Sequence, residues 1–544
     1  MNRRNLLKNL ALAAPAAWLP SVVAGLNWSP LAPAAFQPTW DSLAQYQTPE
    51  WYRDAKFGLW AHWGPQCQPE RGDWYARSIY QEGSDDYQFH VEKYGHPFKF
   101  GFKDVINEWK AEEWNPDELL ALYKKAGAKY FVALANHHDN FDLYNSTHQP
   151  WNSTRLGPKK DLVGGWAKAA KKQGLRFGVS VHAAHTWSWL ETSQRADKAG
   201  PLAGVPYDGK TTATAGQGTW WQGYDPQALY AQDHPLSQNS QDNGMINRQW
   251  DWGNGVAPPS KEYCEKFYDR TIELLDKYEP DLVYFDDTAL PLWPVSDAGL
   301  RIAAHMYNTS AQRNGGCNEA VINGKILTPA QRKCMVWDIE RGQSNEIEPL
   351  PWQTCTCIGQ WHYDRRIYDN HGYKSAQTVI HTLIDVVSKN GNLLVSVPVR
   401  GNGTIDEQER AVVEGIAAWM QANSESIYGT RPWKIFGEGP AQAAAISAQG
   451  FNESKGKPFG AEDIRYVTKG KTLFATALGW PTNGRLLLKS LAMGGPHYPG
   501  KVRQVELLGV LGKLQFEHTK DGLAVVLPAQ KPNAIAYALK IMPA

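Results

Sequence analysis

Two adjacent histidines and an aspartate follow a strongly apolar segment, and they are the first residues of this chain that point to chemistry. Tyr130–Ala135 predicts a buried strand, and His137, His138 and Asp139 come directly after Asn136. Neighbouring strand residues point to opposite faces, so three polar residues in a row add nothing to the packing of a core strand. Other apolar segments also end in polar residues: His62, His182, His185, Asp286, Asp287, Asp338 and Glu340.

These histidines and carboxylates suit two kinds of hydrolysis. Two carboxylates that flank a glycosidic bond can cleave it, while histidine and tryptophan side chains hold the sugar hydroxyls. Alternatively, histidine and aspartate side chains can bind a metal ion that activates water. The residue types alone leave both alternatives open.

The elements that position these residues repeat one order: helix, helix breaker, apolar strand, polar tip. Asn115-Pro116-Asp117-Glu118 opens a helix that ends at Gly127, before the strand Tyr130–Ala135. The order recurs at Asp161–Val181, Lys261–Phe285 and Ser375–Val397. Near-continuous apolar strands are typical of parallel strands buried on both faces. We predict a (β/α)8-like TIM barrel rather than an open sheet, because no glycine-rich phosphate loop follows any strand.

The composition changes near residue 430, where a second domain is expected. Asp406–Ala422 predicts a last amphipathic helix, and Ser424–Trp433 is interpreted as a connector. Short β-rich segments separated by Gly, Asn and Pro turns follow, which is typical of a small β-sandwich. The predicted domains are a barrel at 35–425 and a C-terminal β-sandwich at 435–544.

Residues 1–24 have the features of an export signal. Arg3-Arg4 precedes an apolar stretch, Leu10–Ala24, that is too short for a stable membrane span. The arginine pair predicts the twin-arginine pathway, which moves folded proteins, and hence a periplasmic or secreted location. No later run of about 20 apolar residues predicts a membrane span.

Bulk composition narrows the class of partner. The net charge of +1 gives no reason to expect nucleic acid. The 24 tryptophans slightly favour a carbohydrate-binding protein, because indole faces stack on sugar rings. The six cysteines permit disulfides in an oxidising compartment, but their pairing cannot be deduced. Cys355-Thr356-Cys357 lacks the second pair that a zinc site would need.

Longer motifs resemble the glycoside hydrolase family 29 α-L-fucosidases. They begin at Ala55–Gly64 (AKFGLWAHWG), end at Ser426–Gly429 (SIYG) and keep the family's order over roughly residues 40–435. Between them lie Asp73–Tyr75, Asn136–Asp142 (NHHDNFD), Trp151–Ser153, Gly174–Val181, Pro280–Asp286 (PDLVYFD) and Lys389–Leu394 (KNGNLL). The resemblance implies an irregular (β/α) barrel followed by a β-sandwich, and no cofactor.

The resemblance identifies Asp286, which closes the PDLVYFD motif, as the catalytic nucleophile. Its carboxylate would attack the anomeric carbon and form a covalent glycosyl-enzyme. The general acid/base lies in a variable region of the family. We predict Glu340, which directly follows a predicted strand, with Glu346 and Glu348 as alternatives. Gln353 stands where many relatives have glutamate, and it is excluded because an amide is no carboxylic acid.

By the same resemblance, the residues that would contact fucose are His62, Asp73, Trp74, His137, His138 and Trp361. Asp73 stands where many members have glutamate, so its side chain reaches less far. His182 and His185 lie outside the commonest family pattern, and we expect them to shape a wall or a leaving-group subsite, with a metal pair as the alternative. The long segment 191–256 predicts an insertion over the mouth of the site.

The sequence therefore predicts an exported, retaining α-L-fucosidase that acts on a fucosylated glycan without metal or cofactor. One alternative is a metal-dependent hydrolase that uses the histidines. The other is a fucose-binding protein that has lost catalysis, against which the presence of Asp286 and nearby acids argues. The natural linkage and the oligomeric state are not predicted.

Overall fold

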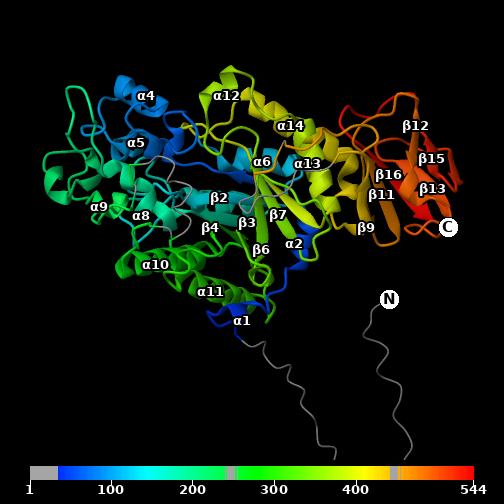
Figure 1. The fold of residues 1–544 in the computed structure, drawn as a ribbon, viewed down its shortest axis with the longest axis horizontal. Coiled ribbons are helices and arrows are strands. Elements are labelled where there is room, and N and C mark those ends of the chain that lie inside the picture. Colours follow the sequence, from blue (N-terminus) through cyan, green and yellow to red (C-terminus); the bar gives the residue numbers. More distant parts are fainter. Residues whose placement is uncertain (1–34, 239, 242–251, 254, 442–450, 454) are drawn as a thin grey trace, which may run out of the picture. The chain divides into compact units, whose positions relative to one another are not determined.

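Eight parallel strands close into a barrel, as the sequence predicts (Figure 1). The structure, a computed structural model, describes residues 35–238, 240–241, 252–253, 255–441, 451–453 and 455–544, so the export signal predicted at 1–24 lies outside it. Each strand pairs with the next in chain order, and β1 pairs with β8. The strands are β1 (Phe57–Ala61), β2 (Tyr130–Asn136), β3 (Arg176–Val181), β4 (Leu282–Thr288), β5 (Val321–Lys325), β6 (Val336–Glu340), β7 (Trp352–Cys357) and β8 (Gly391–Ser396).

Helices connect the strands, and their ends follow the predicted capping. The Asn115 side chain accepts the Glu118 N–H at the start of α6, and Gly174 ends α7 in the left-handed conformation. The longer helices are α4 (Asp85–Lys93), α5 (Phe102–Glu108), α6 (Pro116–Lys125), α7 (Leu162–Gln173), α10 (Lys261–Tyr278), α11 (Ala298–Arg313), α13 (Ala376–Ser388) and α14 (Glu407–Asn423). The shorter ones are α1 (Trp40–Leu43), α2 (Glu50–Ala55), α3 (Tyr75–Ser78), α8 (Thr186–Trp189), α9 (Gln227–Tyr230) and α12 (Arg365–Asp369).

Strand β7 contains no apolar run, because its side chains enter a polar layer inside the barrel. Gln353 accepts hydrogen bonds from the hydroxyls of Tyr52 (2.8 Å) and Tyr130 (3.1 Å) and donates one to Asp338 (2.8 Å). Burial raises the pKa of Asp338 to about 7. This layer lies inside the barrel, so Gln353 is a core residue, in line with its exclusion as acid/base.

The C-terminal domain consists of two antiparallel sheets, which confirms the predicted fold class. Its strands are β9 (Arg431–Glu438), β10 (Ile464–Lys469), β11 (Thr472–Ala477), β12 (Arg485–Leu488), β13 (Val502–Leu507), β14 (Phe516–Thr519), β15 (Gly522–Val526) and β16 (Tyr537–Pro543). One sheet has the order β13-β16-β11-β10-β9, and the other β12-β15-β14. Strand β9 begins inside Ser424–Trp433, so the interpretation of that whole segment as a connector was wrong.

Buried charges join the barrel to the C-terminal domain at α13, which packs against β9 and β10. Asp385 on α13 lies 2.7 Å from Lys389 and 2.5 Å from Arg465 of β10, and all three side chains are almost fully buried. The Trp419 indole donates to the Ala536 carbonyl (3.0 Å). The two domains therefore share a specific interface.

None of the six cysteines forms a disulfide, and only Cys317 is exposed. Within the described ranges, the helices lack the length and apolar character needed to cross a membrane.

Candidate active site

A cavity of about 510 Å³ lies at the carboxyl ends of the barrel strands. In a barrel these ends meet on one face, where loops and strand tips converge. Seven of the predicted residues line the cavity: His62, Asp73, Trp74, His137, Asp286, Glu340 and Trp361. Four of them, His62, His137, Asp286 and Glu340, were predicted from the strand tips, and the other three from the family resemblance.

Asp286, near the end of β4, is surrounded by nitrogen atoms. One carboxylate oxygen, Oδ2, lies 3.1 Å from Nδ1 of His182 and 3.2 Å from Nε2 of His138, and the other contacts Nζ of Lys325. Burial acts to raise the pKa of Asp286, but Lys325 and the two histidines outweigh it and hold that pKa well below its usual range. Asp286 is thus an ionised carboxylate at neutral pH.

Glu340, at the end of β6, meets the same lysine with the opposite electrostatic result. Its Oε2 lies 2.5 Å from Nζ of Lys325. Burial raises the pKa of Glu340; Lys325 opposes this, and repulsion from Asp286 adds to it. Two carboxylates whose pKa values are pushed apart are typical of a nucleophile beside a general acid.

The two alternative acids lie elsewhere. Glu348 accepts a hydrogen bond from the Ser344 hydroxyl (2.6 Å) and lies 3.6 Å from Arg332. Neither Glu348 nor Glu346 is among the residues that line the cavity, whereas Glu340 is. The structure thus favours Glu340 among the three candidates.

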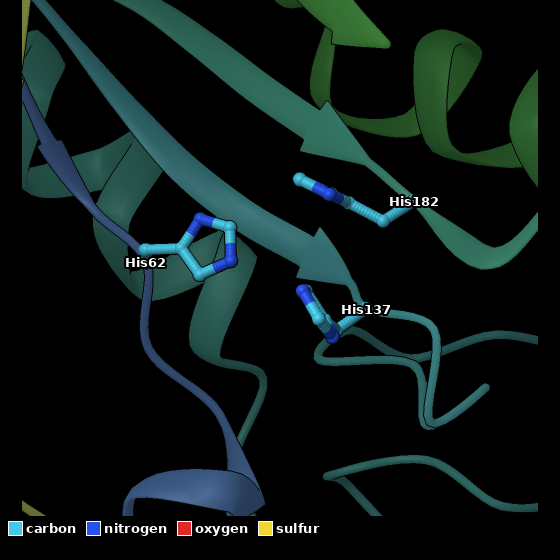
Figure 2. A group of neighbouring side chains, drawn as sticks. All are labelled: His62, His137 and His182. Atoms are coloured by element: carbon cyan, nitrogen blue, oxygen red, sulfur yellow. The ribbon is translucent and has the colours of Figure 1, made fainter. Parts of the chain in front are cut away.

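Three buried histidines, His62, His137 and His182, turn their rings toward one another (Figure 2). Burial, reinforced by the neighbouring histidines, lowers the pKa of His62 and of His137 well below the usual range. Burial also lowers the pKa of His182 to about 4, although Asp286 opposes it. All three are neutral at pH 7, so they act as hydrogen-bonding groups rather than as charges.

The tautomer of His137 follows from its neighbour Gln66. The Gln66 amide nitrogen lies 2.8 Å from Nδ1 of His137 and 3.2 Å from Asp139, while its oxygen accepts the Ala76 N–H. This orientation makes Nδ1 an acceptor and leaves the proton on Nε2. His137 therefore offers a donor, which suits a sugar hydroxyl.

His138 lies behind the nucleophile rather than in the cavity wall. Its Nδ1 donates to the His182 carbonyl (2.7 Å), and its Nε2 faces Asp286. His185 is also buried, 2.7 Å from Asp287 and stacked on Trp252. His182 lines the cavity, as expected of a wall residue, and also contacts the nucleophile, whereas His185 does not line the cavity.

Asp73 holds the loop that carries Trp361. Its carboxylate accepts the backbone N–H groups of His362 (2.7 Å) and Trp361 (3.3 Å). The Trp361 ring then lies 5.6 Å from His62. Trp74 lines the same cavity from a left-handed backbone conformation, with a φ of 65°.

Two groups of side chains have the spacing of metal ligands: His62, His137 and His182, and His138, His182 and Asp286. In each group the ligand atoms lie within 4.8 Å of one another. In the second group Nδ1 of His182 donates to the ionised Asp286, and in the first group the His137 proton lies on Nε2. Binding of an ion through Nε2 of His137 would require the loss of that proton, whereas a sugar hydroxyl can accept a hydrogen bond from it.

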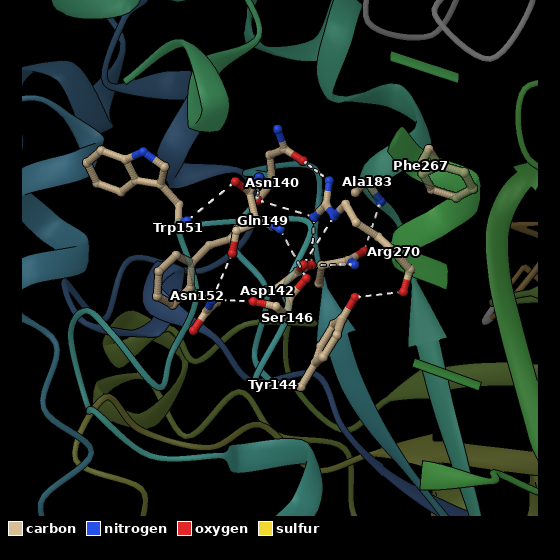
Figure 3. A network of polar contacts seen from close by, with 12 residues as sticks. Asn140, Asp142, Tyr144, Ser146, Gln149, Trp151, Asn152, Ala183, Phe267 and Arg270 are labelled. Atoms are coloured by element: carbon tan, nitrogen blue, oxygen red, sulfur yellow. Dashed lines mark hydrogen bonds and ion pairs between the residues drawn. The ribbon is translucent and has the colours of Figure 1, made fainter. Parts of the chain in front are cut away.

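A buried ion pair fixes the loop after β2 (Figure 3). Arg270 on α10 contacts Asp142 at 2.6 and 3.1 Å and donates to the Asn140 side chain (2.6 Å). Asp142 in turn accepts from Asn136, whose oxygen accepts the backbone N–H of His182. The pair therefore supports the backbone that carries the histidine beside the nucleophile.

Replacing Arg270 with methionine should lower the free energy of unfolding by about 3–5 kcal/mol, because Asp142 would be left charged and buried. Urea denaturation followed by tryptophan fluorescence measures this. Arg301→Met, which removes the partly exposed pairs with Glu265 and Asp297, is the matched control and should cost at most about 1 kcal/mol. Equal effects of the two changes would contradict the prediction.

The described part of segment 191–256 does not line the cavity. It contacts the loop after β3, where Gln232 donates to the Trp187 carbonyl (3.1 Å), and it is held internally by the hydrogen bond from Tyr230 to Asp208 (2.7 Å). The predicted place over the mouth of the site is thus not seen in this part of the segment.

Six residues that line the cavity were not predicted as site residues: Trp60, Tyr284, Lys325, Ile326, Arg341 and Phe451. Lys325 is the polar residue at the end of strand β5, so the strand-tip pattern that predicts Asp286 also applies to Lys325. Only three apolar residues, Ala320–Ile322, precede Asn323-Gly324, and this pair resembles a turn. No sequence pattern connects Phe451, from the C-terminal domain, with the barrel.

Comparison with known proteins agrees with this geometry. The sequence model of α-L-fucosidase matches residues 26–425, and that of the α-L-fucosidase C-terminal domain matches residues 457–542. The chain is 26% identical over 528 residues to the tissue α-L-fucosidase of Rattus norvegicus, covering 94% of this chain and 93% of that protein. It is 25% identical over 525 residues to the plasma α-L-fucosidase of Homo sapiens, covering 93% and 92%. The crystal structure of Thermotoga maritima α-fucosidase in complex with fucose aligns with a TM-score of 0.68 at 25% identity, covering 93% of this chain and 100% of that one. Because the family match spans most of the sequence, this chain belongs to the α-L-fucosidases of glycoside hydrolase family 29.

Proposed function

We propose that the protein is a retaining α-L-fucosidase that removes terminal α-L-fucosyl residues from glycans by double displacement. The observation that carries the proposal is the arrangement of Asp286 and Glu340 around Lys325. One carboxylate has a lowered pKa and the other a raised pKa, as a nucleophile and a general acid require.

In the first step, an oxygen of Asp286 attacks the anomeric carbon while the bond from that carbon to the leaving oxygen breaks. Glu340 transfers its proton to the leaving oxygen, which departs as an alcohol. In the second step, the Glu340 carboxylate takes a proton from water, whose oxygen displaces Asp286 from the sugar. Lys325 favours the ionised form of whichever carboxylate is deprotonated.

The spacing of the carboxylates supports retention of configuration. Because both contact one nitrogen, the two contacting oxygens lie no more than about 5 Å apart, against ~5–5.5 Å between the carboxyl groups of retaining enzymes and ~6.5–9.5 Å of inverting enzymes. Proton NMR during hydrolysis of an aryl α-L-fucoside tests this. α-L-Fucose should form first, and β-L-fucose as the first product would contradict the proposal.

Activity should not require a metal ion. The histidines of the cavity are assigned to hydroxyls, so dialysis against EDTA should leave kcat/KM for an aryl fucoside unchanged. Elemental analysis of the active protein provides the control, with less than one equivalent of any transition metal expected. Loss of activity in EDTA that zinc restores would support the metal-dependent hydrolase instead.

We also propose export by the twin-arginine route. The Arg3-Arg4 pair before Leu10–Ala24 supports this, and cysteines that form no disulfides suit a protein that folds before transport. Replacing both arginines with lysine should retain the protein in the cytoplasmic fraction. Unchanged fractionation would contradict the route.

A further inference from the structure

One of the described residues that line the cavity, Phe451, comes from the C-terminal domain. Phe451, whose position in the chain lies between β9 and β10, lines the cavity together with Ile326 and Arg341 of the barrel. Phe451 is 43% exposed, although its side chain is large and apolar. An exposed phenylalanine at the rim of a sugar-binding cavity is available for contact with a ligand.

The segment 451–453 is attached directly to the strand tip that carries the acid/base. The Phe451 N–H donates to the Glu340 carbonyl (2.8 Å), and the Glu453 N–H donates to the Arg341 carbonyl (2.9 Å). The Asn452 side chain accepts the Gln343 N–H (2.7 Å) and donates to its carbonyl (3.0 Å). These bonds fix the position of Phe451 relative to Glu340.

Charged contacts hold the other end of the segment. Glu453 accepts hydrogen bonds from Lys374 (2.6 Å) and Thr356 (2.8 Å) and lies 3.3 Å from Arg341. Burial acts to raise the pKa of Glu453, but Lys374 and Arg341 outweigh burial and lower that pKa. Glu453 is thus an ionised anchor between the barrel and the C-terminal domain.

The local backbone is shaped for this contact. A Cβ on Gly342 would lie 2.8 Å from the Asn452 side-chain oxygen and 2.7 Å from Ile339, so only glycine allows the segment so close. Arg341 (φ 45°), Ile326 (φ 53°) and Phe451 (φ 57°) all have left-handed backbone conformations. Such conformations cost energy in non-glycine residues, and they concentrate at functional sites.

We infer that Phe451 forms the leaving-group subsite and stacks on the pyranose ring to which fucose is attached. This rests on the proposed function, in which Glu340 protonates the leaving oxygen. A residue bonded to the Glu340 backbone and facing the cavity lies on the leaving-group side of the cleaved bond. Phenylalanine offers an apolar face and no hydrogen bond, so it suits the C–H face of a sugar ring or an aryl group.

The experiment compares substrates that differ only in the leaving group. Phe451→Ala should lower kcat/KM for a fucosyl disaccharide and for an aryl α-L-fucoside by about ten-fold, which corresponds to about 1.4 kcal/mol of lost contact. kcat/KM for α-L-fucosyl fluoride, whose leaving group has no ring, should stay within about two-fold. The inhibition constant of fucose should also stay unchanged.

Two further variants separate contact from folding. Phe451→Trp should restore turnover of the disaccharide, because it keeps an aromatic face. Leu511→Ala is the matched control, because Leu511 is a fully exposed apolar residue of the C-terminal domain. It should leave kcat/KM unchanged for every substrate.

The outcomes distinguish this inference from the proposed function. A wild-type protein that hydrolyses neither fucosyl fluoride nor the aryl fucoside would contradict the function itself. With an active wild type, equal rates for Phe451→Ala and wild type on every substrate would overturn the subsite. An equal loss on fucosyl fluoride and on the disaccharide would also overturn it, since Phe451 would then serve the fucose site or the fold.

Discussion

Replacing Asp286 with glycine should lower kcat/KM for an aryl α-L-fucoside by roughly 10⁴-fold or more, because no covalent intermediate can form. The protein should stay folded and bind fucose, since Lys325 keeps Glu340 as a partner. Steady-state rates and fucose titration calorimetry measure the two effects. Asp287→Asn is the matched control: this neighbouring carboxylate faces His185, and its loss should leave at least about a tenth of the activity.

Azide gives the same variant a distinctive product. In Asp286→Gly the small anion can occupy the space of the lost carboxylate and attack the substrate once, so β-L-fucosyl azide should accumulate. A folded Asp286→Gly protein with near wild-type turnover would remove Asp286 from the nucleophile role.

Replacing Glu340 with alanine should slow substrates in proportion to how poor their leaving group is. For a substrate whose leaving group needs protonation, kcat/KM should fall by about 10²–10⁴-fold. For a dinitrophenyl fucoside, whose leaving group departs unprotonated, kcat/KM should fall far less. Comparing aryl fucosides of graded leaving-group pKa measures this dependence. Glu348→Ala, outside the cavity, should behave like the wild type.

Azide distinguishes Glu340 from Asp286 by configuration. In Glu340→Ala, azide attacks the fucosyl-enzyme in place of water, so a second inversion yields α-L-fucosyl azide. If Glu340→Ala slows all leaving groups equally and azide has no effect, while Glu346→Ala or Glu348→Ala shows both properties, the acid/base is that other residue.

The pH profile provides a further check on Glu340. Glu340 must carry a proton in the first step, and burial raises its pKa. The rate constant kcat/KM should therefore fall as the pH rises through that pKa, and Glu340→Gln should abolish this alkaline limb. An unchanged limb in Glu340→Gln would assign it to another group.

Much of the site could be predicted because barrel strands bring sequence-distant residues together at one face. Asp286, Glu340 and His137 each follow an apolar run, and this order alone places them near one another. Their roles depended on the resemblance to the family, since strand order gives proximity and not chemistry.

The rest of the fold and of the site could not be predicted, because it depends on side-chain direction and on contacts between the domains. The sequence predicts a sugar contact for His138 and a wall position for His182, but not that both face Asp286, because rotamers and tautomers decide which atom a histidine offers. β7 was missed because its inward residues hydrogen-bond one another instead of packing as apolar side chains. Phe451 is separated from Glu340 by more than a hundred residues and a domain boundary, and no periodicity encodes that contact.

The attachment of segment 451–453 to the tip of β6 has a consequence for how such enzymes diversify. A recombination event at the junction between the domains would leave the nucleophile, the acid/base and the histidines in one parental half. The other half would bring a different residue to the rim beside Glu340. Exchange of the C-terminal half between homologues would thus generate enzymes with inherited chemistry and new glycan preference, provided that position 342 remains glycine and the Glu453 anchor is kept.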